Sequence, residues 1–370
     1  MKIIRSRYAG ACYGVKRALD LVDAAASAEI DDKDGVATPA NATLANAALT
    51  NGAPVSAAPA DGVFAGSTPV PPTTTTTVPA DGVLADGVSV PPAPPAPAPV
   101  PPTTITTAPT PTTPTPAAPP DSAIVYTLGP LIHNPQVVSE LRLRGVLVAD
   151  TVADAPSGTL VIRSHGVAPS VIQEAQAKGL LVIDATCPHV AKAQRAAKKL
   201  QEQGYQVLIV GGLGHPEVES IKAYAGDKAL VVQEPADLPE TFDSPKIGVV
   251  VQTTQTEQNL AAVVDALHAR GIEPVVHSTI CSATRQRQEA ASELAQKVDV
   301  MLVIGGRNSS NTTRLTQLCQ KVCPHTYHIE QASELDPTWF TGAQTVGITA
   351  GASTPEDQIT TVEQALKGLL

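Results

Sequence analysis

The sequence is poor in aromatic residues and in long apolar runs. Phe, Tyr and Trp make up only 3% of the 370 residues, so its cores must be aliphatic, although 43% of the residues are hydrophobic. No stretch approaches the roughly 20 apolar residues that a membrane-spanning helix needs. The N-terminal stretch MKIIRSRYAGACYG has no apolar region typical of a secretory signal. We therefore expect a soluble, cytoplasmic protein with no membrane partner.

Excess positive charge is also absent. The formal net charge is −10, whereas affinity for nucleic acid depends on basic surface that contacts phosphates. The composition therefore argues against a nucleic-acid partner and against a polybasic membrane anchor. The five cysteines are a poor basis for a disulfide framework, because they are odd in number and secretion is not expected. Metal binding or catalysis is the better expectation for a cysteine in a special context.

A low-complexity segment interrupts the chain. Most of the 34 prolines lie between about residues 51 and 120, where VPPTTTTT recurs as VPPTTITT. This segment lacks the large apolar side chains that offset ordering entropy, so we predict a disordered insertion over residues 29–121. It could dock a partner. A tolerated expansion of a surface loop is the favoured interpretation, because loop-closure entropy grows slowly with length.

The rest of the chain alternates two patterns. Short β-branched runs such as VLIVGG, IGVVVQT and VMLVIGG are separated by amphipathic stretches such as EQNLAAVVDALHARG. Apolar runs of this kind are typical of buried parallel strands, and the amphipathic stretches are typical of helices. The alternation therefore predicts an α/β fold.

Three cysteines share one context. Cys12, Cys187 and Cys281 each follow a strand pattern and precede a helical one, and Pro188 suits a first helical position. Cys281 is about as far from Cys187 as from the C-terminus, and the longer gap after Cys12 becomes similar without the insertion. The chain therefore divides into three near-equal α/β units. The predicted domains are residues 1–28 with 122–185, residues 186–280 and residues 281–370.

Polar turns recur within these units. The turns of His133, His215 and Ser309 follow their cysteines at matching distances, and RSHGV, VQTTQT and TAGAST follow later strands. Ligands of open α/β sheets bind at the carboxyl ends of strands, so three units around an axis would bring these turns to one cavity. The candidate polar residues are His133, His165, His215, Glu217, Thr253, Thr254, Ser309, Ser310, Asn311 and Ser353.

The candidate residues suggest the chemistry. Thiolates at helix N-termini are favoured as anions, and three of them could hold zinc or an iron–sulfur cluster. A cluster held by three cysteines leaves one iron open to substrate. The uncharged donors suit a diphosphate, with little need for Arg or Lys, and Glu217 could carry protons. A zinc site or a redox sensor without catalysis stays open on the cysteines alone.

Nine ordered motifs together resemble the 4-hydroxy-3-methylbut-2-enyl diphosphate reductase (IspH/LytB) family. They are GACYGVKRAL, GPLIHNPQ, SHGV, DATCPHVAKAQ, GHPEVES, QTT, STICSATRQRQ, NSSNTTRL and TAGASTP, and they span the chain except for about residues 29–121. The resemblance implies a trefoil of three similar α/β domains around one [4Fe–4S] cluster. It also implies that Cys12, Cys187 and Cys281 hold this cluster and leave one iron open to substrate.

The resemblance further implies a reaction. This is the two-electron reductive dehydroxylation of (E)-4-hydroxy-3-methylbut-2-enyl diphosphate to isopentenyl and dimethylallyl diphosphates, the last step of the non-mevalonate (MEP) isoprenoid pathway. A ferredoxin or flavodoxin is the implied electron donor. The implied catalytic residues are Glu217, Thr253 and His215. The implied substrate contacts are His133, His165, His215, Thr253, Thr254, Ser309, Ser310, Asn311 and Ser353.

Two departures and one alternative accompany this resemblance. Ala11 stands where the family usually has an aromatic residue, with Tyr13 after the cysteine, and Ser220 replaces the usual glycine after HPEVE. The alternative is another three-cysteine [4Fe–4S] trefoil enzyme, such as a quinolinate-synthase-like dehydratase, which does not explain HPEVE together with NSSN. Cys319 and Cys323 lack the strand–cysteine–helix context, and we expect them to be core thiols.

Overall fold

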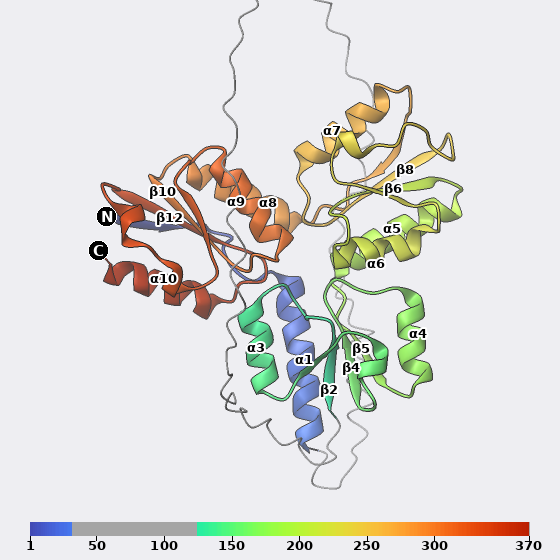
Figure 1. Ribbon diagram of the computed structural model, residues 1–370, viewed down its shortest axis with the longest axis horizontal. Coiled ribbons are helices and arrows are strands. Elements are labelled where there is room, and N and C mark those ends of the chain that lie inside the picture. Colours follow the sequence, from blue (N-terminus) through green and yellow to red (C-terminus); the bar gives the residue numbers. More distant parts are fainter. Residues whose placement is uncertain (32–123, 370) are drawn as a thin grey trace, which may run out of the picture. The chain divides into compact units, whose positions relative to one another are not determined.

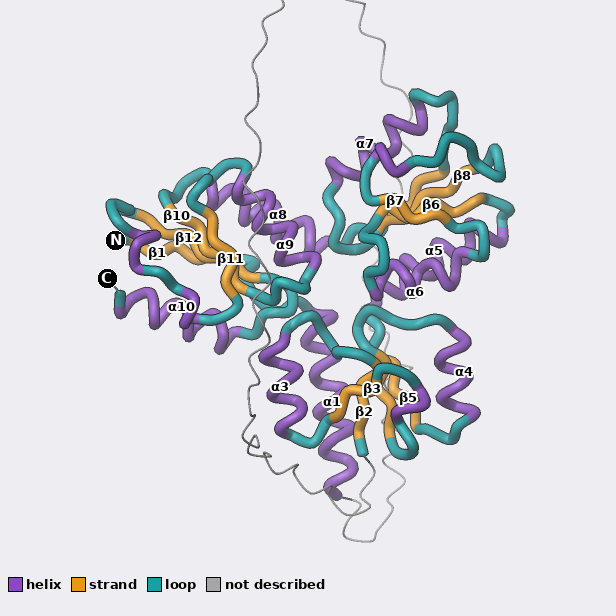
Figure 2. Tube along the Cα trace, in the orientation of Figure 1, coloured by secondary structure: helices purple, strands orange, loops and turns teal. Residues whose placement is uncertain are grey.

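The computed structural model describes residues 1–31 and 124–369, so the predicted insertion lies almost entirely outside the described residues. Within these ranges the strands form three parallel sheets of four strands each (Figures 1 and 2). The predicted α/β fold with parallel strands is therefore confirmed. We call each sheet with its helices a lobe.

The first lobe has the strand order β3-β2-β4-β5. Its strands are β2 (Val125–Leu128), β3 (Leu147–Ala149), β4 (Thr159–Ile162) and β5 (Leu181–Asp184). One face of the sheet packs against α1 (Tyr13–Asp31) and α3 (Pro135–Leu143). The other face packs against α4 (Pro169–Ala177) and the short 3₁₀ helix η2 (Val152–Asp154).

The second lobe repeats this arrangement with the order β7-β6-β8-β9. Its strands are β6 (Gln206–Val210), β7 (Leu230–Val232), β8 (Ile247–Val251) and β9 (Val275–His277). One face packs against α5 (Pro188–Glu202) and α6 (Pro216–Ala225). The other face packs against α7 (Glu257–His268), and η3 (Pro235–Asp237) precedes β8.

The third lobe has the order β11-β10-β12-β1. Its strands are β10 (Val300–Ile304), β11 (Thr326–Ile329), β12 (Thr345–Ala350) and β1 (Lys2–Arg5). One face packs against α8 (Ser282–Ala295) and α9 (Ser310–Gln320). The other packs against α10 (Glu356–Gly368), with η4 (Ala332–Glu334) and η5 (Pro337–Phe340).

Both faces of each sheet are covered, and this explains the uninterrupted apolar strand patterns. In β10, Leu302 and Ile304 enter one core cluster, whereas Met301 and Val303 enter the cluster on the opposite face. All four side chains are 0% exposed. The described cores are largely aliphatic, as the low aromatic content predicts. Within the described ranges, no helix is long and apolar enough to cross a membrane.

The N-terminal strand lies in the third lobe. Lys2–Arg5 pairs in parallel with residues 345–348 of β12, whereas α1 packs on the first sheet. The expected first domain groups residues 1–28 together, whereas in the structure β1 belongs to the third sheet and α1 packs on the first. The reason is topological. The first and second sheets receive their last edge strand from the end of their own unit, but α10 is followed by no further strand in the described chain, so β1 takes that place.

Each crossing from one lobe to the next coincides with a cysteine. Cys187 follows β5 of the first sheet and precedes α5, which packs on the second sheet. Cys281 follows β9 of the second sheet and precedes α8 of the third lobe. Cys12 follows β1 of the third sheet and precedes α1 of the first lobe. The predicted strand–cysteine–helix context is confirmed, and it marks the joints between lobes.

Candidate functional site

The three sheets present their carboxyl ends to one site. In each sheet the strand order reverses between the two inner strands, which are β2 and β4, β6 and β8, or β10 and β12. Ligands of open α/β sheets bind at such switch points. The predicted residues follow these strands: His133 after β2, His165 after β4, His215 after β6, Thr253 after β8, Ser309 after β10 and Ser353 after β12.

One cavity unites all the predicted site residues. Its lining includes Cys12, Cys187, Cys281, His133, His165, His215, Glu217, Thr253, Thr254, Ser309, Ser310, Asn311 and Ser353. Gly14, His189 and Thr284 also line it. None of these three residues is among the site residues predicted from the sequence. The lining comes from all three lobes. The cavity therefore exists only where the lobes meet.

Backbone hydrogen bonds connect each cysteine to a turn of this cavity. The N–H of every one of the three cysteines donates to a carbonyl in the turn that follows the neighbouring inner strand. These bonds join Cys12 to Ala352 (3.0 Å), Cys187 to Ser164 (2.9 Å) and Cys281 to Thr253 (3.0 Å). These bonds hold each cysteine next to a polar turn at the carboxyl end of a sheet.

The Cys187 thiol lies directly against the first turn of α1. A Cβ atom at Gly14 would lie 2.5 Å from the Cys187 Sγ atom, which is closer than real Cβ contacts. Residue 14 is therefore glycine because any larger side chain would meet the Cys187 thiol. In the described ranges, no three His, Cys, Asp or Glu side chains are grouped closely enough to hold one metal ion. A cluster differs from a single ion because each thiolate binds its own iron, so its ligands stand further apart.

Burial dominates the ionisation of Cys187. It raises the pKa of this thiol to about 11, and the N–H groups of His189 and Val190 at the start of α5 act in the opposite direction. The helix N-terminus does favour the thiolate, as the sequence predicts. Its effect on the pKa is smaller than that of burial, so the free thiol stays protonated at neutral pH. Binding of a metal centre there must release a proton, because the thiolate is the ligand.

The three predicted histidines form a cluster. The ring centroids of His133 and His165 lie 4.2 Å apart, and His215 lies 5.3 Å from His133 and 5.7 Å from His165. Burial lowers the pKa of each ring, to about 4 for His215. All three are therefore neutral at pH 7. The Nδ1 atom of His215 accepts the N–H of Glu217 at 3.1 Å, so its hydrogen is on Nε2.

Glu217 and Thr253 form a buried pair. The Glu217 side chain is 3% exposed. Its Oε1 atom accepts the Thr253 N–H at 2.6 Å, and its Oε2 atom accepts the Thr253 hydroxyl at 2.9 Å. Burial raises the pKa of Glu217 to about 7, although both hydrogen bonds act to lower it. This carboxyl group can therefore both hold and release a proton near neutral pH.

The N-terminus of α9 supplies uncharged donors. Ser309 is the N-cap residue, and its Oγ atom accepts the N–H of Thr312 at 3.4 Å. Asn311 is 4% exposed, yet neither its Nδ2 nor its Oδ1 atom has a hydrogen-bond partner in the structure. A buried amide without a partner is costly, and a helix N-terminus favours anions. These residues fit an anionic ligand in the cavity.

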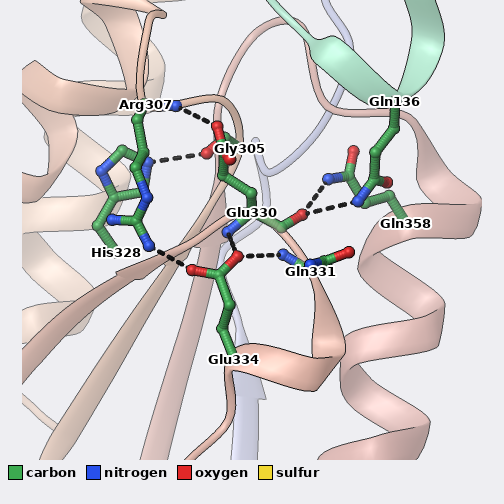
Figure 3. Close-up of polar contacts among 8 residues, drawn as sticks. All are labelled: Gln136, Gly305, Arg307, His328, Glu330, Gln331, Glu334 and Gln358. Atoms are coloured by element: carbon green, nitrogen blue, oxygen red, sulfur yellow. Dashed lines mark hydrogen bonds and ion pairs between the residues drawn. The ribbon is translucent and has the colours of Figure 1, made fainter. Parts of the chain in front are cut away.

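A carboxylate network supports the turn that leads into α9 (Figure 3). Glu330 accepts the N–H of Arg307 at 2.7 Å, and the Glu334 carboxylate pairs with the Arg307 guanidinium. Gln136 of α3 donates to the Glu330 carbonyl at 3.3 Å. The network therefore joins α3 of the first lobe to the turn before α9 of the third lobe.

Sequence reasoning missed several supporting residues. Asn134 is 1% exposed; it caps α3 and donates to the Ser353 carbonyl at 2.9 Å, while Ser353 donates to the His133 carbonyl at 3.0 Å. Arg163 and Arg314 contribute to the lowered pKa of His215, although the donor set indicated little need for arginine. The strings RSHGV and NSSNTTR contain both arginines, but only the fold shows that they lie near the histidines.

The departures from the family pattern have clear positions. Tyr13 is 69% exposed, so it does not replace a packed aromatic residue before Cys12. Ser220 is buried and donates to the carbonyls of His165 at 2.7 Å and Glu217 at 2.8 Å. Its hydroxyl therefore stabilises the His165 turn.

The remaining two cysteines are core thiols, as predicted. Cys319 is 0% exposed and Cys323 is 4% exposed, and both belong to the core cluster beneath α8 and α9. Burial raises the pKa of Cys319 to about 12. Both thiols are therefore buried away from solvent and away from the cavity.

Together these features define a class of α/β protein in which three parallel sheets share one cavity at their carboxyl ends, lined by thiols and uncharged polar side chains. The LytB protein family model matches residues 115–367. The chain belongs to this family, as the nine motifs predict.

Relatives and solved structures agree with this family. A protein of Pelobacter propionicus named 4-hydroxy-3-methylbut-2-enyl diphosphate reductase is 53% identical over 231 residues, which cover 62% of this chain and 82% of that protein. A solved structure of this reductase, described as the terminal enzyme of the non-mevalonate pathway, covers 100% of both chains with a TM-score of 0.54 and 32% identity. The Plasmodium falciparum reductase structure has a TM-score of 0.62 and 26% identity, and covers 66% of this chain and 79% of its own.

Proposed function

We propose that this chain reduces (E)-4-hydroxy-3-methylbut-2-enyl diphosphate to isopentenyl and dimethylallyl diphosphates, the last step of the non-mevalonate pathway. The observation that carries the proposal is the single cavity that combines three cysteines, uncharged anion donors and the buried Glu217–Thr253 pair. Two relatives named 4-hydroxy-3-methylbut-2-enyl diphosphate reductase support the proposal. They favour it over the quinolinate-synthase-like alternative.

The proposed cofactor is one [4Fe–4S] cluster held by Cys12, Cys187 and Cys281. Membership of the family implies an iron–sulfur cofactor, and the one cavity that all three cysteines line supports its placement here. When bound with one iron open to substrate, such a cluster supplies electrons and a Lewis acid for the leaving hydroxyl group. The chain's own residues supply the binding and the protons.

Neutral hydrogen-bond donors would bind the diphosphate. His215 presents its Nε2–H because Nδ1 is occupied by the Glu217 N–H. Asn311 has a buried amide free to donate, and the hydroxyls of Ser309, Ser310 and Ser353 line the same cavity. His133 and His165 complete the substrate contacts, with Thr254 beside Thr253. Arg163 and Arg314 lie near His215 and add positive charge beside these uncharged donors.

Glu217 would deliver the proton to the leaving hydroxyl group. Its pKa of about 7 keeps much of the carboxyl protonated at neutral pH. The Thr253 hydroxyl holds the carboxyl in place and can pass the proton on, because a hydroxyl both donates and accepts. The departing oxygen then leaves as water, and two electrons with a second proton, taken up at either end of the allylic unit, complete the two products. A cytoplasmic location and a ferredoxin or flavodoxin as electron donor belong to the same proposal.

Anaerobic purification tests the proposal. The purified protein should be brown and contain about four irons per chain. With reduced viologen as electron donor, it should also convert the hydroxymethylbutenyl diphosphate. A colourless zinc protein would contradict the cluster assignment. An iron–sulfur protein that does not turn over this substrate would favour the dehydratase alternative.

A further inference from the structure

Arg287 of α8 is a buried cation in an unusual position. Its side chain is 4% exposed, and Nε has no hydrogen-bond partner. Nη2 donates to the Gly10 carbonyl at 2.7 Å, and Nη1 donates to the Ala283 carbonyl at 3.3 Å. Among the described residues no carboxylate forms an ion pair with it. A buried charge without a counterion is costly, so the counterion must come from elsewhere.

Arg287 joins the two chain segments that carry Cys12 and Cys281. Burial lowers the pKa of Arg287, and Cys12 and Cys281 act in the opposite direction. The guanidinium also spans the two chain segments that carry these cysteines. Gly10 lies two residues before Cys12 and has a φ of 109°, which favours glycine, and α8 begins directly after Cys281. Arg287 therefore fixes one lobe crossing against another.

We propose that Arg287 is a positioning residue for the cluster, which sets the distance between Cys12 and Cys281 and balances the charge of the thiolates. This inference rests on the proposed function, because it needs an anionic group held by both cysteines. It assigns a role to a side chain that does not line the cavity. The planar guanidinium suits the task because it grips two carbonyls at once, which an ammonium group does less well.

The test uses the full-length protein with its cluster, purified without oxygen. Arg287→Gln removes the positive charge. Arg287→Lys keeps the charge but loses the planar group that donates to two carbonyls. Arg285→Gln is the matched control. Arg285 is on the same helix, but it is half-exposed and pairs with Glu257 at 3.5 Å. Two quantities are measured: the rate at which a chelator removes iron, and the midpoint potential of the cluster.

Arg287→Gln should release iron at least about tenfold faster than the control, because hydrogen bonds from a charged donor are lost. Its midpoint potential should become more negative, since reduction adds negative charge beside the missing cation. Arg287→Lys should keep a potential near that of the wild type and release iron faster. If Arg287→Gln does not fold, the iron-release rate of Arg287→Lys decides, and a wild-type rate overturns the inference.

Two outcomes separate this inference from the proposed function. A wild-type protein that takes up no cluster contradicts the proposed function, and the inference falls with it. A wild-type cluster together with an Arg287→Gln variant that matches Arg285→Gln in both measurements contradicts the inference alone.

Discussion

At the scale of single residues, the environment of Glu217 decides how the proposed chemistry depends on pH. Its pKa is raised to about 7 by burial, so the protonated acid dominates below this pH and disappears above it. Turnover should therefore fall as pH rises through about 7. Glu217→Gln should lose most turnover, roughly a hundredfold or more for a positioned acid, and should keep the cluster.

The control for this prediction is Glu219→Gln. Glu219 is on the same helix but exposed, so its replacement should leave turnover and the pH profile unchanged. Both variants are compared by steady-state rates over pH 5.5 to 8.5 and by iron content. Full activity in Glu217→Gln would show that this carboxyl does not deliver the proton.

The histidine cluster predicts proton uptake on binding. The pKa of His215 is about 4, so the ring is neutral in the free protein. A diphosphate beside it favours the charged form and raises this pKa, and the added proton on Nδ1 would replace the hydrogen bond from the Glu217 N–H. Titration calorimetry with inorganic diphosphate at pH 6, in two buffers of different ionisation enthalpy, should therefore show more proton uptake by the wild type than by His215→Gln. Equal uptake would mean that the anion binds away from His215.

At the scale of elements, the first turn of α1 can approach the Cys187 thiol closely only because residue 14 is glycine. A methyl group at Gly14 would meet the Cys187 Sγ atom at 2.5 Å. A free thiol can rotate away, but a ligand cannot. Gly14→Ala should therefore keep the fold and lose most of the iron, as measured by iron content and thermal unfolding. Gly368→Ala in α10 is the control, because a Cβ there meets nothing within 4 Å.

Local sequence predicts elements well here and their partners poorly. The strand–cysteine–helix context of Cys187 and Cys281 is carried by neighbouring residues, and the structure contains it. The partner of β1 lies more than 340 positions away in β12, and no local pattern reports it. In the sequence, Arg287 is one of several cations on a predicted helix, and only the fold shows its hydrogen bond to the Gly10 carbonyl. Asn134 likewise becomes informative only once Ser353 is beside it.

At the scale of the whole molecule, β1 closes the third sheet. Deleting residues 2–5 removes the partner of β12 and uncovers a bare sheet edge. We expect a lower unfolding temperature, from the loss of about 1 kcal/mol for each ladder hydrogen bond, and a lower iron content because Cys12 loses its anchor. Deleting residues 369–370 at the other terminus of the same lobe is the control. Equal unfolding temperatures for both deletions would contradict the role of β1.

The position of the cysteines at the three lobe crossings has a consequence for assembly. Each thiol stands between a sheet of one lobe and a helix that packs on the next lobe, so its position depends on both cores. An incomplete chain can offer one or two of the thiols in place, but not three. Maturation of the metal centre would then follow folding rather than guide it, and the acquired colour of the protein would report that all three joints are closed.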